Sequence, residues 1–203
     1  LRPRNELRGL ALRRPEQRGP VGPLHGIPLA FKDQGDVKEM PTTMGSILFE
    51  GHMPERDCFV AAKLRDAGAI FIAKTALGEM GAGDTHGSLF GSTRNVYDQT
   101  RTAGGSSGGS GAAASANFCA AAIGQEGFAS IRRPSIWNGI VGMRPTAGLV
   151  SRGGVYAGWP STNGSLRPAA RCCSCAGNAN YANHPVYLVD FILGGLRVQM
   201  RGR

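Results

Sequence analysis

The chain has 203 residues, of which 41% are hydrophobic and 18% are charged, and its formal net charge is +9. This length can bury a core and is typical of one domain, or of two. The positive charge lies at the ends: residues 1–18 carry +4, residues 167–203 carry +4, and the stretch between them carries only +1. This distribution argues against a nucleic-acid-binding module and against an anionic membrane as partner.

The sequence also bears on location. Residues 1–4 are not followed by the apolar core of a secretory signal. The apolar stretch over residues 186–196 is too short to cross a bilayer and is interrupted by Asp190. We therefore expect a soluble, cytoplasmic protein without a membrane partner.

The first predicted elements are a strand and a helix. Residues 25–32 read His-Gly-Ile-Pro-Leu-Ala-Phe-Lys, which predicts a turn and then a strand that ends at Lys32. A helix is predicted from an Asp57 cap to Ala67, followed by a stop at Gly68. Its apolar face is expected to consist of Phe59, Val60 and Leu64.

The rest of the chain alternates between short apolar runs and small-residue segments. Residues 69–73 predict a short buried strand, and residues 77–101 predict a loop around a pocket. An alanine-rich helix is predicted over residues 110–118, followed by a strand over 119–123 and an apolar segment at 141–143. This alternation predicts an α/β fold in which helices cover a mixed sheet.

A run of small residues at 104–110 reads Gly-Gly-Ser-Ser-Gly-Gly-Ser and has several alternative interpretations. Runs of this composition usually form flexible linkers, but here a predicted helix and a predicted strand follow the run directly. A phosphate-binding loop would need a Gly-Lys-Ser/Thr ending, which is missing. A nucleophile elbow would need a strand immediately before the serine, and residues 97–101 do not predict one.

Two serines and one lysine offer a different chemistry. Ser106 lies in the glycine-rich run, Ser130 follows 24 positions later, and Lys32 ends an apolar strand. A hydroxyl attacks an amide only when a base removes its proton. A lysine can be that base when burial or a nearby cation keeps it neutral. A Ser–Ser–Lys relay, with one serine between the base and the nucleophile, is therefore chemically reasonable.

These motifs, in this order and spacing, resemble the amidase signature family of serine hydrolases. The resemblance extends from about Gly22 to about Leu166 and suggests a partial amidase signature fold. The motifs that carry it are Gly-Pro-Leu-His-Gly-Ile-Pro at 22–28, Ala-Lys-Thr at 73–75, the small-residue run, Ser-Ile-Arg at 130–132 and Gly-Ile-Val-Gly-Met-Arg-Pro-Thr at 139–146.

The resemblance assigns a role to each of the three residues. It implies that Lys32 is the general base, that Ser106 is the bridging serine after a cis peptide bond, and that Ser130 is the nucleophile that carries the acyl group. Backbone N–H groups of Gly127, Phe128 and Ala129 are expected to form the oxyanion hole. The reaction needs neither a metal nor another cofactor.

The loop before Ser130 departs from the family pattern. Its sequence is Gly-Gln-Glu-Gly-Phe-Ala-Ser, where the family has small residues after a Thr-Asp pair. Glu126 is expected to replace the aspartate as the structural partner of Arg132. Phe128 is expected to narrow the acyl pocket, which would alter substrate preference without loss of chemistry.

The ends of the chain do not follow the family. We divide the chain into a basic flank of doubtful reading frame (1–21), a partial amidase core (22–166) and an aberrant or truncated tail (167–203). Cys172, Cys173 and Cys175 in this tail lack the spacing and companion histidines of a zinc site. Cys58 and Cys119 lie in apolar runs and are interpreted as small buried hydrophobic residues.

Together these observations predict hydrolysis of a small-molecule carboxylic amide through a seryl acyl-enzyme. Two alternatives remain open: the glutamine-hydrolysing subunit of a tRNA-dependent amidotransferase, and a catalytically inactive amidase fragment. The sequence leaves a homodimer open as the quaternary structure, and it does not identify the amide.

Overall fold

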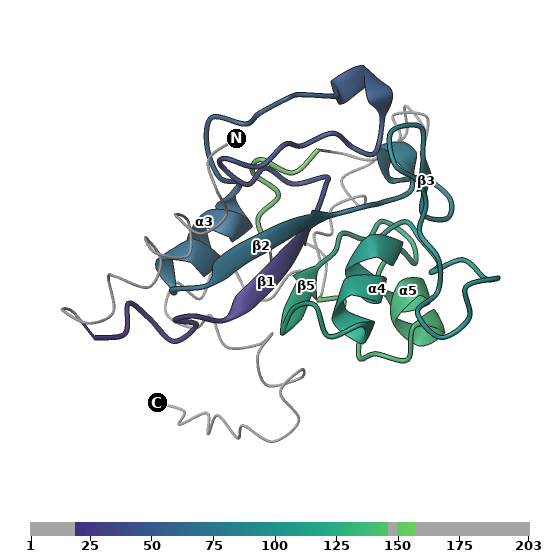
Figure 1. Cartoon of the computed structure of the whole chain (residues 1–203). Helices are drawn as coiled ribbons and strands as arrows, with labels where there is room; N and C mark the ends of the chain where they lie inside the picture. Colours follow the sequence, from purple (N-terminus) through teal and green to yellow (C-terminus); the bar gives the residue numbers. More distant parts are fainter. Residues whose placement is uncertain (1–18, 146–149, 157–203) are drawn as a thin grey trace, which may run out of the picture.

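The computed structural model describes residues 19–145 and 150–156. Within these ranges, strands lie at the centre and helices lie on either side of them (Figure 1). Most of the predicted basic flank and the predicted tail, including its three cysteines, fall outside the described residues.

Three parallel strands form the main sheet. They are β1 (Pro28–Lys32), β2 (Ile70–Thr75) and β5 (Ala121–Ile123), in the spatial order β2-β1-β5. Lys32 aligns with Thr75 of β2, and Phe31 aligns with Ile123 of β5. The predicted α/β class is therefore confirmed, and all three described strands of this sheet are parallel. A separate antiparallel pair joins β3 (His86–Gly87) to β4 (Gly91–Ser92).

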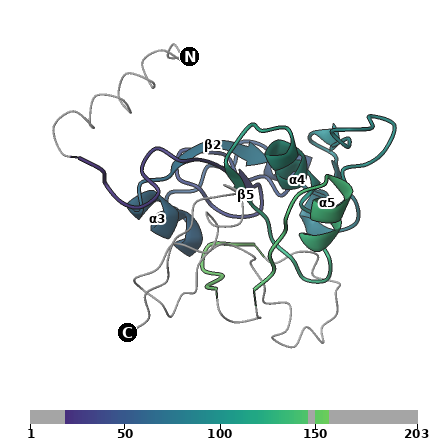
Figure 2. The same ribbon diagram turned by 90° about the horizontal axis from the view of Figure 1, so that it is seen from below.

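Among the described residues, three α-helices accompany the sheet: α3 (Phe59–Asp66), α4 (Gly108–Ser115) and α5 (Arg132–Trp137). Two 3-10 turns, η1 (Ile47–Phe49) and η2 (Glu79–Gly81), lie in the connections. The chain moves from β1 outward to β2 through α3, and then back across β1 to β5 through α4. Right-handed crossovers in opposite directions place α3 and α4 on opposite faces of the sheet. Figure 2 shows α3 well separated from the α4–α5 pair.

The apolar core lies between the sheet and α3. Leu29 and Phe31 of β1 point to this face, because alternate residues of a strand share a face. The rings of Phe31 and Phe71 meet edge to face with their centroids 5.8 Å apart. The other large members of this core are Leu24, Val37, Val60, Leu64, Ile123 and Val150.

The start of α3 differs from the prediction. Cys58, not Asp57, is the N-cap, and its Sγ accepts a hydrogen bond from the N–H of Ala61 at 3.4 Å. Asp57 instead binds the Arg65 guanidinium at 2.7 Å and the backbone N–H of Lys38 at 2.7 Å. Phe59, expected on the buried face, is 37% exposed, because Val60, Ala61 and Leu64 form that face.

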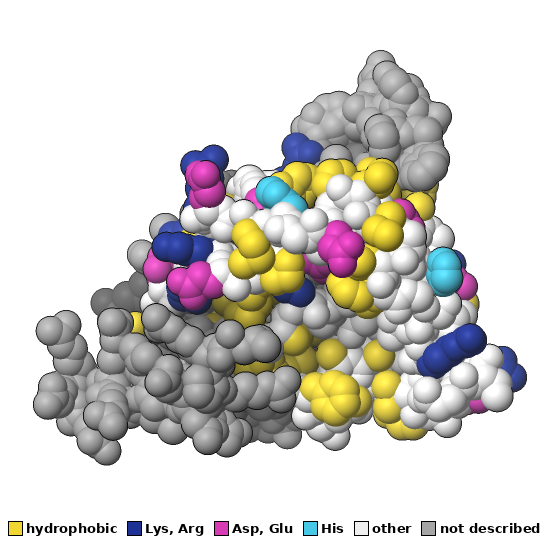
Figure 3. Space-filling view, turned by 45° about the horizontal axis from the view of Figure 1, so that its top comes forward, with side chains coloured by type: hydrophobic (Ala, Val, Ile, Leu, Met, Phe, Trp, Pro, Cys, Tyr) yellow, Lys and Arg dark blue, Asp and Glu magenta, His cyan; other side chains and the backbone are white. Residues whose placement is uncertain are grey.

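Strand β2 is also less buried than predicted. Phe71 faces the core, whereas Ile70 and Ile72 are 43% and 46% exposed on the opposite face. This alternation follows from the pleat of the strand, which the short apolar run could not reveal. On the face seen in Figure 3, exposed hydrophobic side chains are interspersed with polar and charged ones.

Glycine permits the close packing of α4 against the neighbouring segments. A Cβ atom on Gly109 would lie 2.3 Å from the carbonyl oxygen of Ala76, and one on Gly108 would lie 2.2 Å from Oγ1 of Thr85. Ser110 of α4 shares a hydrogen bond with Thr75 at 2.7 Å and donates to the carbonyl of Ile123 at 3.0 Å. The small-residue run is therefore a tightly packed segment, and the linker interpretation is wrong.

Candidate active site

Lys32 ends β1 inside the protein, with only 1% of its surface exposed. Its position on β1 directs it away from Leu29 and Phe31 and toward the small-residue segment. The Lys32 Nζ lies 2.8 Å from Oγ of Ser106 and 3.3 Å from the carbonyl oxygen of Gln125. The Lys32 amine is therefore enclosed by protein and lies in contact with the first of the two serines.

The two serines continue the chain of hydrogen bonds from Lys32. The Ser106 hydroxyl donates to Oγ of Ser130 at 3.0 Å, and the Gly105–Ser106 peptide is cis. The backbone of each serine is also held: Gly78 N–H donates to the Ser106 carbonyl at 2.9 Å, and Ser107 N–H donates to the Ser130 carbonyl at 3.2 Å. The three residues singled out in the sequence are thus brought together.

The loop before Ser130 presents unused backbone donors. Gly127 and Phe128 are exposed, and Ala129 is half-buried. Within the described part of the chain, the N–H groups of residues 127–130 make no hydrogen bond. N–H groups next to Ser130 that have no partner among the described residues have the chemistry expected of an oxyanion hole. The Phe128 side chain is 79% exposed, and no residue in this part of the chain encloses it.

Glu126, which directly precedes residues 127–130, anchors this loop. Its carboxylate is fully buried and accepts hydrogen bonds from Arg132 Nε at 2.7 Å, Arg132 N–H at 3.0 Å and Ile131 N–H at 2.8 Å. The pairing with Arg132 is the one expected from the sequence, and Arg144 at 3.5 Å adds a second cation that the sequence did not suggest. The carboxylate of Glu126 thus binds the N–H groups of the α5 N-cap, Ile131, and of the first α5 residue, Arg132.

Ser130 does not cap the helix that follows it. Helix α5 has Ile131 at its N-cap position, without a side-chain cap hydrogen bond. The Ser130 hydroxyl is instead directed to Ser106 at 3.0 Å.

A second buried lysine lies beside the site and was not assigned a role from the sequence. Lys74 of β2 donates to Asp33 at 2.9 Å, to the Pro41 carbonyl at 2.9 Å and to Thr42 Oγ1 at 2.9 Å. Burial lowers the pKa of Lys74, and the attraction of Asp33 opposes that shift. Asp33 also accepts hydrogen bonds from Thr43, so the ion pair links the ends of β1 and β2 to the segment at 41–45. No local spacing pairs residues 33 and 74, so only the strand register reveals the contact.

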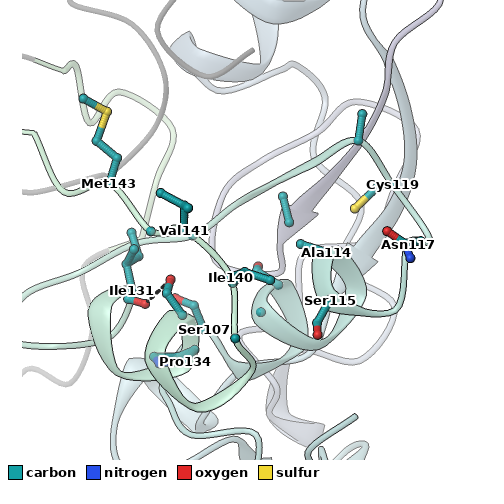
Figure 4. Close-up of a pocket in the computed structure, with 18 of the residues that line it drawn as sticks. Ser107, Ala114, Ser115, Asn117, Cys119, Ile131, Pro134, Ile140, Val141 and Met143 are labelled. Carbon is teal, nitrogen blue, oxygen red and sulfur yellow. Dashed lines mark hydrogen bonds between the residues drawn. The ribbon is translucent and has the colours of Figure 1, made fainter. Parts of the chain in front are cut away.

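A cavity of about 520 Å³ lies next to the two serine segments (Figure 4). Ser107 and Ile131, the neighbours of Ser106 and Ser130, line it together with Cys119, Ile140 and Met143. The remaining lining is formed mainly by alanine, glycine and serine of α4, β5 and the segment at 139–143.

The described residues carry few other candidate groups. The thiols of Cys58 and Cys119 are buried, and burial raises the pKa of each, as expected of inert packing residues. Within residues 19–145 and 150–156, no cluster of three or more His, Cys, Asp or Glu could hold a metal ion. No helix in these ranges is both long and apolar enough to cross a bilayer.

Comparison with known proteins identifies the family of this chain. The Amidase family model matches residues 6–177. The chain belongs to the amidase signature family. Over 138 residues, it is 49% identical to a subunit of the glutamyl-tRNA(Gln) amidotransferase of Acidothermus cellulolyticus, and the match covers 68% of this chain and 27% of that protein.

Solved structures share the fold. The native peptide amidase of Stenotrophomonas maltophilia superposes with a TM-score of 0.69 and 39% identity, over 72% of this chain and 31% of that one. The corresponding glutamyl-tRNA(Gln) amidotransferase subunit of Thermotoga maritima gives a TM-score of 0.64 and 41% identity, over 66% and 30%. This member of the amidase signature family thus spans less than a third of the length of these relatives.

Proposed function

We propose that this protein hydrolyses a small-molecule carboxylic amide through an acyl-enzyme on Ser130. The observation that carries the proposal is the continuous chain of hydrogen bonds from Lys32 through Ser106 to Ser130, with contacts of 2.8 and 3.0 Å. Each hydroxyl can both donate and accept a proton, so a proton can pass along the chain in either direction.

In the reactive state, both hydrogen bonds run toward the lysine. Neutral Lys32 Nζ accepts the proton of Ser106, and Ser106 accepts the proton of Ser130 as the Ser130 Oγ attacks the carbonyl carbon. The new C–O bond gives a tetrahedral oxyanion, and the free N–H groups of the loop at 127–130 bind it. The proton returns from Lys32 to the amide nitrogen as the C–N bond breaks and ammonia or an amine leaves. Water then attacks the acyl-enzyme by the same relay and releases the acid.

A fluorophosphonate probe tests this proposal directly. The nucleophile displaces fluoride and keeps the phosphonyl group, and mass spectrometry of the peptides locates the adduct. We expect labelling at Ser130 in the full chain and none in Ser130→Ala. The matched control is Ser92→Ala, because Ser92 is exposed and its hydroxyl contacts His86 at 2.8 Å, away from the relay. An unlabelled wild-type chain that melts cooperatively would refute the acyl-enzyme proposal and favour the inactive fragment.

A second candidate is supported by the similarity to the glutamyl-tRNA(Gln) amidotransferase subunits. In that case, glutamine would be the amide and the chain would act with partner subunits. Release of ammonia from glutamine, compared with release from simple aliphatic and peptide amides, would distinguish the two. Strong preference for glutamine, together with copurifying subunits, would favour the amidotransferase role.

A further inference from the structure

A side chain outside the proposed relay connects the two segments that carry the serines. Arg133, in the first turn of α5, donates from Nε to the carbonyl of Gly105 at 3.1 Å and from Nη2 to the carbonyl of Gly83 at 2.9 Å. Its guanidinium also lies 3.0 Å from the Asp84 carboxylate and 5.5 Å from the centre of the Trp137 ring.

The backbone of Arg133 belongs to the segment of the nucleophile. Its N–H donates to the carbonyl of Ala129 at 2.8 Å, directly before Ser130. Its side chain holds Gly105, directly before Ser106. One residue therefore contacts the chain immediately before each serine.

The other end of α5 is attached to the same segment by different residues. Asn138 donates to the carbonyl of Ala103 at 2.8 Å, and a Cβ atom on Gly104 would lie 3.0 Å from the Trp137 ring. These contacts fix the carboxyl end of the helix. Arg133 acts at the amino end, where Ser130 lies.

The two carbonyl contacts carry more weight than the ion pair. The Arg133 and Asp84 side chains are 36% and 45% exposed, so their ion pair is screened by solvent and contributes little. Two separate carbonyl oxygens, in contrast, match the several fixed donors of a guanidinium, which a lysine ammonium does not reproduce. The shape of the guanidinium thus matches the two carbonyl oxygens at this position.

We propose that Arg133 is a positioning residue, which keeps Ser106 and Ser130 at hydrogen-bond distance by binding the backbone before Ser106 from the helix after Ser130. The effect of Arg133 on catalysis rests on the proposed function, whereas its effect on the placement of the two serines can be tested separately.

Hydrogen exchange of two backbone amides measures the positioning. Ser107 N–H bonds to the Ser130 carbonyl, and Gly78 N–H bonds to the Ser106 carbonyl, so each reports on one serine. In Arg133→Met we expect both to exchange about five to ten times faster than in the wild type, which corresponds to the loss of one typical hydrogen bond.

Arg65→Met is the matched control. Arg65 also pairs with an aspartate, at 2.7 Å, and lies over an aromatic ring, at 5.3 Å, but on α3, away from both serines. It should leave the two reporter amides unchanged. Equal exchange in Arg133→Met and the wild type, or unprotected amides in the wild type itself, would overturn the inference.

Two further variants separate shape from charge. Arg133→Lys keeps the positive charge but should still accelerate hydrogen exchange at both amides. Asp84→Asn should change the two exchange rates by less than about twofold. Full protection in Arg133→Lys would show that charge alone matters and would refute the proposed role.

Fluorophosphonate labelling tests how Arg133 affects the reactivity of Ser130. We expect the labelling rate of Ser130 to fall in Arg133→Met across the whole pH range, with an unchanged pH profile, because the distance between the serines changes and the base does not. A wild-type chain that is not labelled would refute the proposed function, while the exchange experiment would still decide the role of Arg133. A labelling rate in Arg133→Met equal to that in Arg65→Met would overturn the positioning role.

Discussion

The two faces of the sheet are covered by different types of residue. The face toward α3 is closed by large apolar side chains, such as Leu29, Phe31 and Leu64, each no more than 2% exposed. The face toward α4 has glycine and serine in contact with backbone, a hydrogen-bonded chain of three polar side chains and a cavity of about 520 Å³. The same three strands therefore support two kinds of interior.

This difference separates the apolar core from the proposed relay. Burial of large apolar groups on one face contributes free energy without directional requirements. Small residues on the other face let backbone segments approach closely, so hydroxyl and amine groups can be held at fixed distances. Substitutions on the α3 face should therefore change the free energy of unfolding, and those on the α4 face should mainly change reactivity.

The largest expected effect tests the α4 face. Lys32→Met keeps an unbranched side chain but removes the amine, so labelling of Ser130 should slow about a thousandfold near neutral pH. The measurement is the labelling rate, with Lys63→Met on the exposed side of α3 as control. Labelling as fast as in the wild type would show that another group activates Ser130.

The second prediction concerns the α3 face. Leu64→Ala removes a side chain that is 2% exposed and should lower the free energy of unfolding by about 2–5 kcal/mol. Leu48→Ala removes the same atoms from a side chain that is 83% exposed, and it should change the free energy of unfolding by less than about 0.5 kcal/mol. Urea unfolding compares the two, and equal losses would contradict the assignment of the core to the α3 face.

A third variant identifies a group on the α4 face that does contribute stability. Glu126→Gln keeps the shape of a fully buried side chain but places an amide donor or a neutral oxygen against Arg132 and two backbone donors. We expect a loss of about 1–3 kcal/mol in urea unfolding and slower labelling of Ser130. Exposed Glu55 provides the control Glu55→Gln. If both variants unfold alike, the carboxylate does not hold the loop.

The smallest effect is a pH dependence on the α3 face. Burial raises the pKa of Cys58 from 9.0 to about 11, so the folded state keeps a thiol proton that the unfolded state loses. Stability from this group is complete below pH 9 and decreases as the pH rises toward 11. Between about pH 9 and 10 the loss should be about 1 kcal/mol.

Cys58→Ser isolates this effect, because serine also caps a helix and does not ionise in this range. Urea unfolding under reducing conditions at about pH 8, 9 and 10 should therefore show a flatter profile for the variant. Parallel profiles for the two proteins would show that the thiol is not protected from ionisation.

The local pattern of the chain was a good guide to the elements and a poor guide to their details. The order of β1, α3, β2, α4 and β5 and the α/β class followed from apolar runs separated by small residues, whereas helix α5 and the β3–β4 pair were not predicted. The N-cap at Cys58, the exposed positions of Ile70 and Ile72 and the contact of Asp57 with Arg65 did not follow. These depend on which face each element presents to its neighbours, and a short apolar run is compatible with either face.

The sequence by itself singled out three chemical groups, Lys32, Ser106 and Ser130, because a hydroxyl needs a base before it can attack an amide and because the motifs around them resemble those of the amidase signature family. Only the tertiary structure decided how they are held: the 2.8 and 3.0 Å contacts, the Lys74–Asp33 ion pair and the Arg133–Gly105 contact. Each joins residues far apart in the chain. The register of parallel strands and the paths of the connecting loops fix such distances, and no local pattern of residues encodes them.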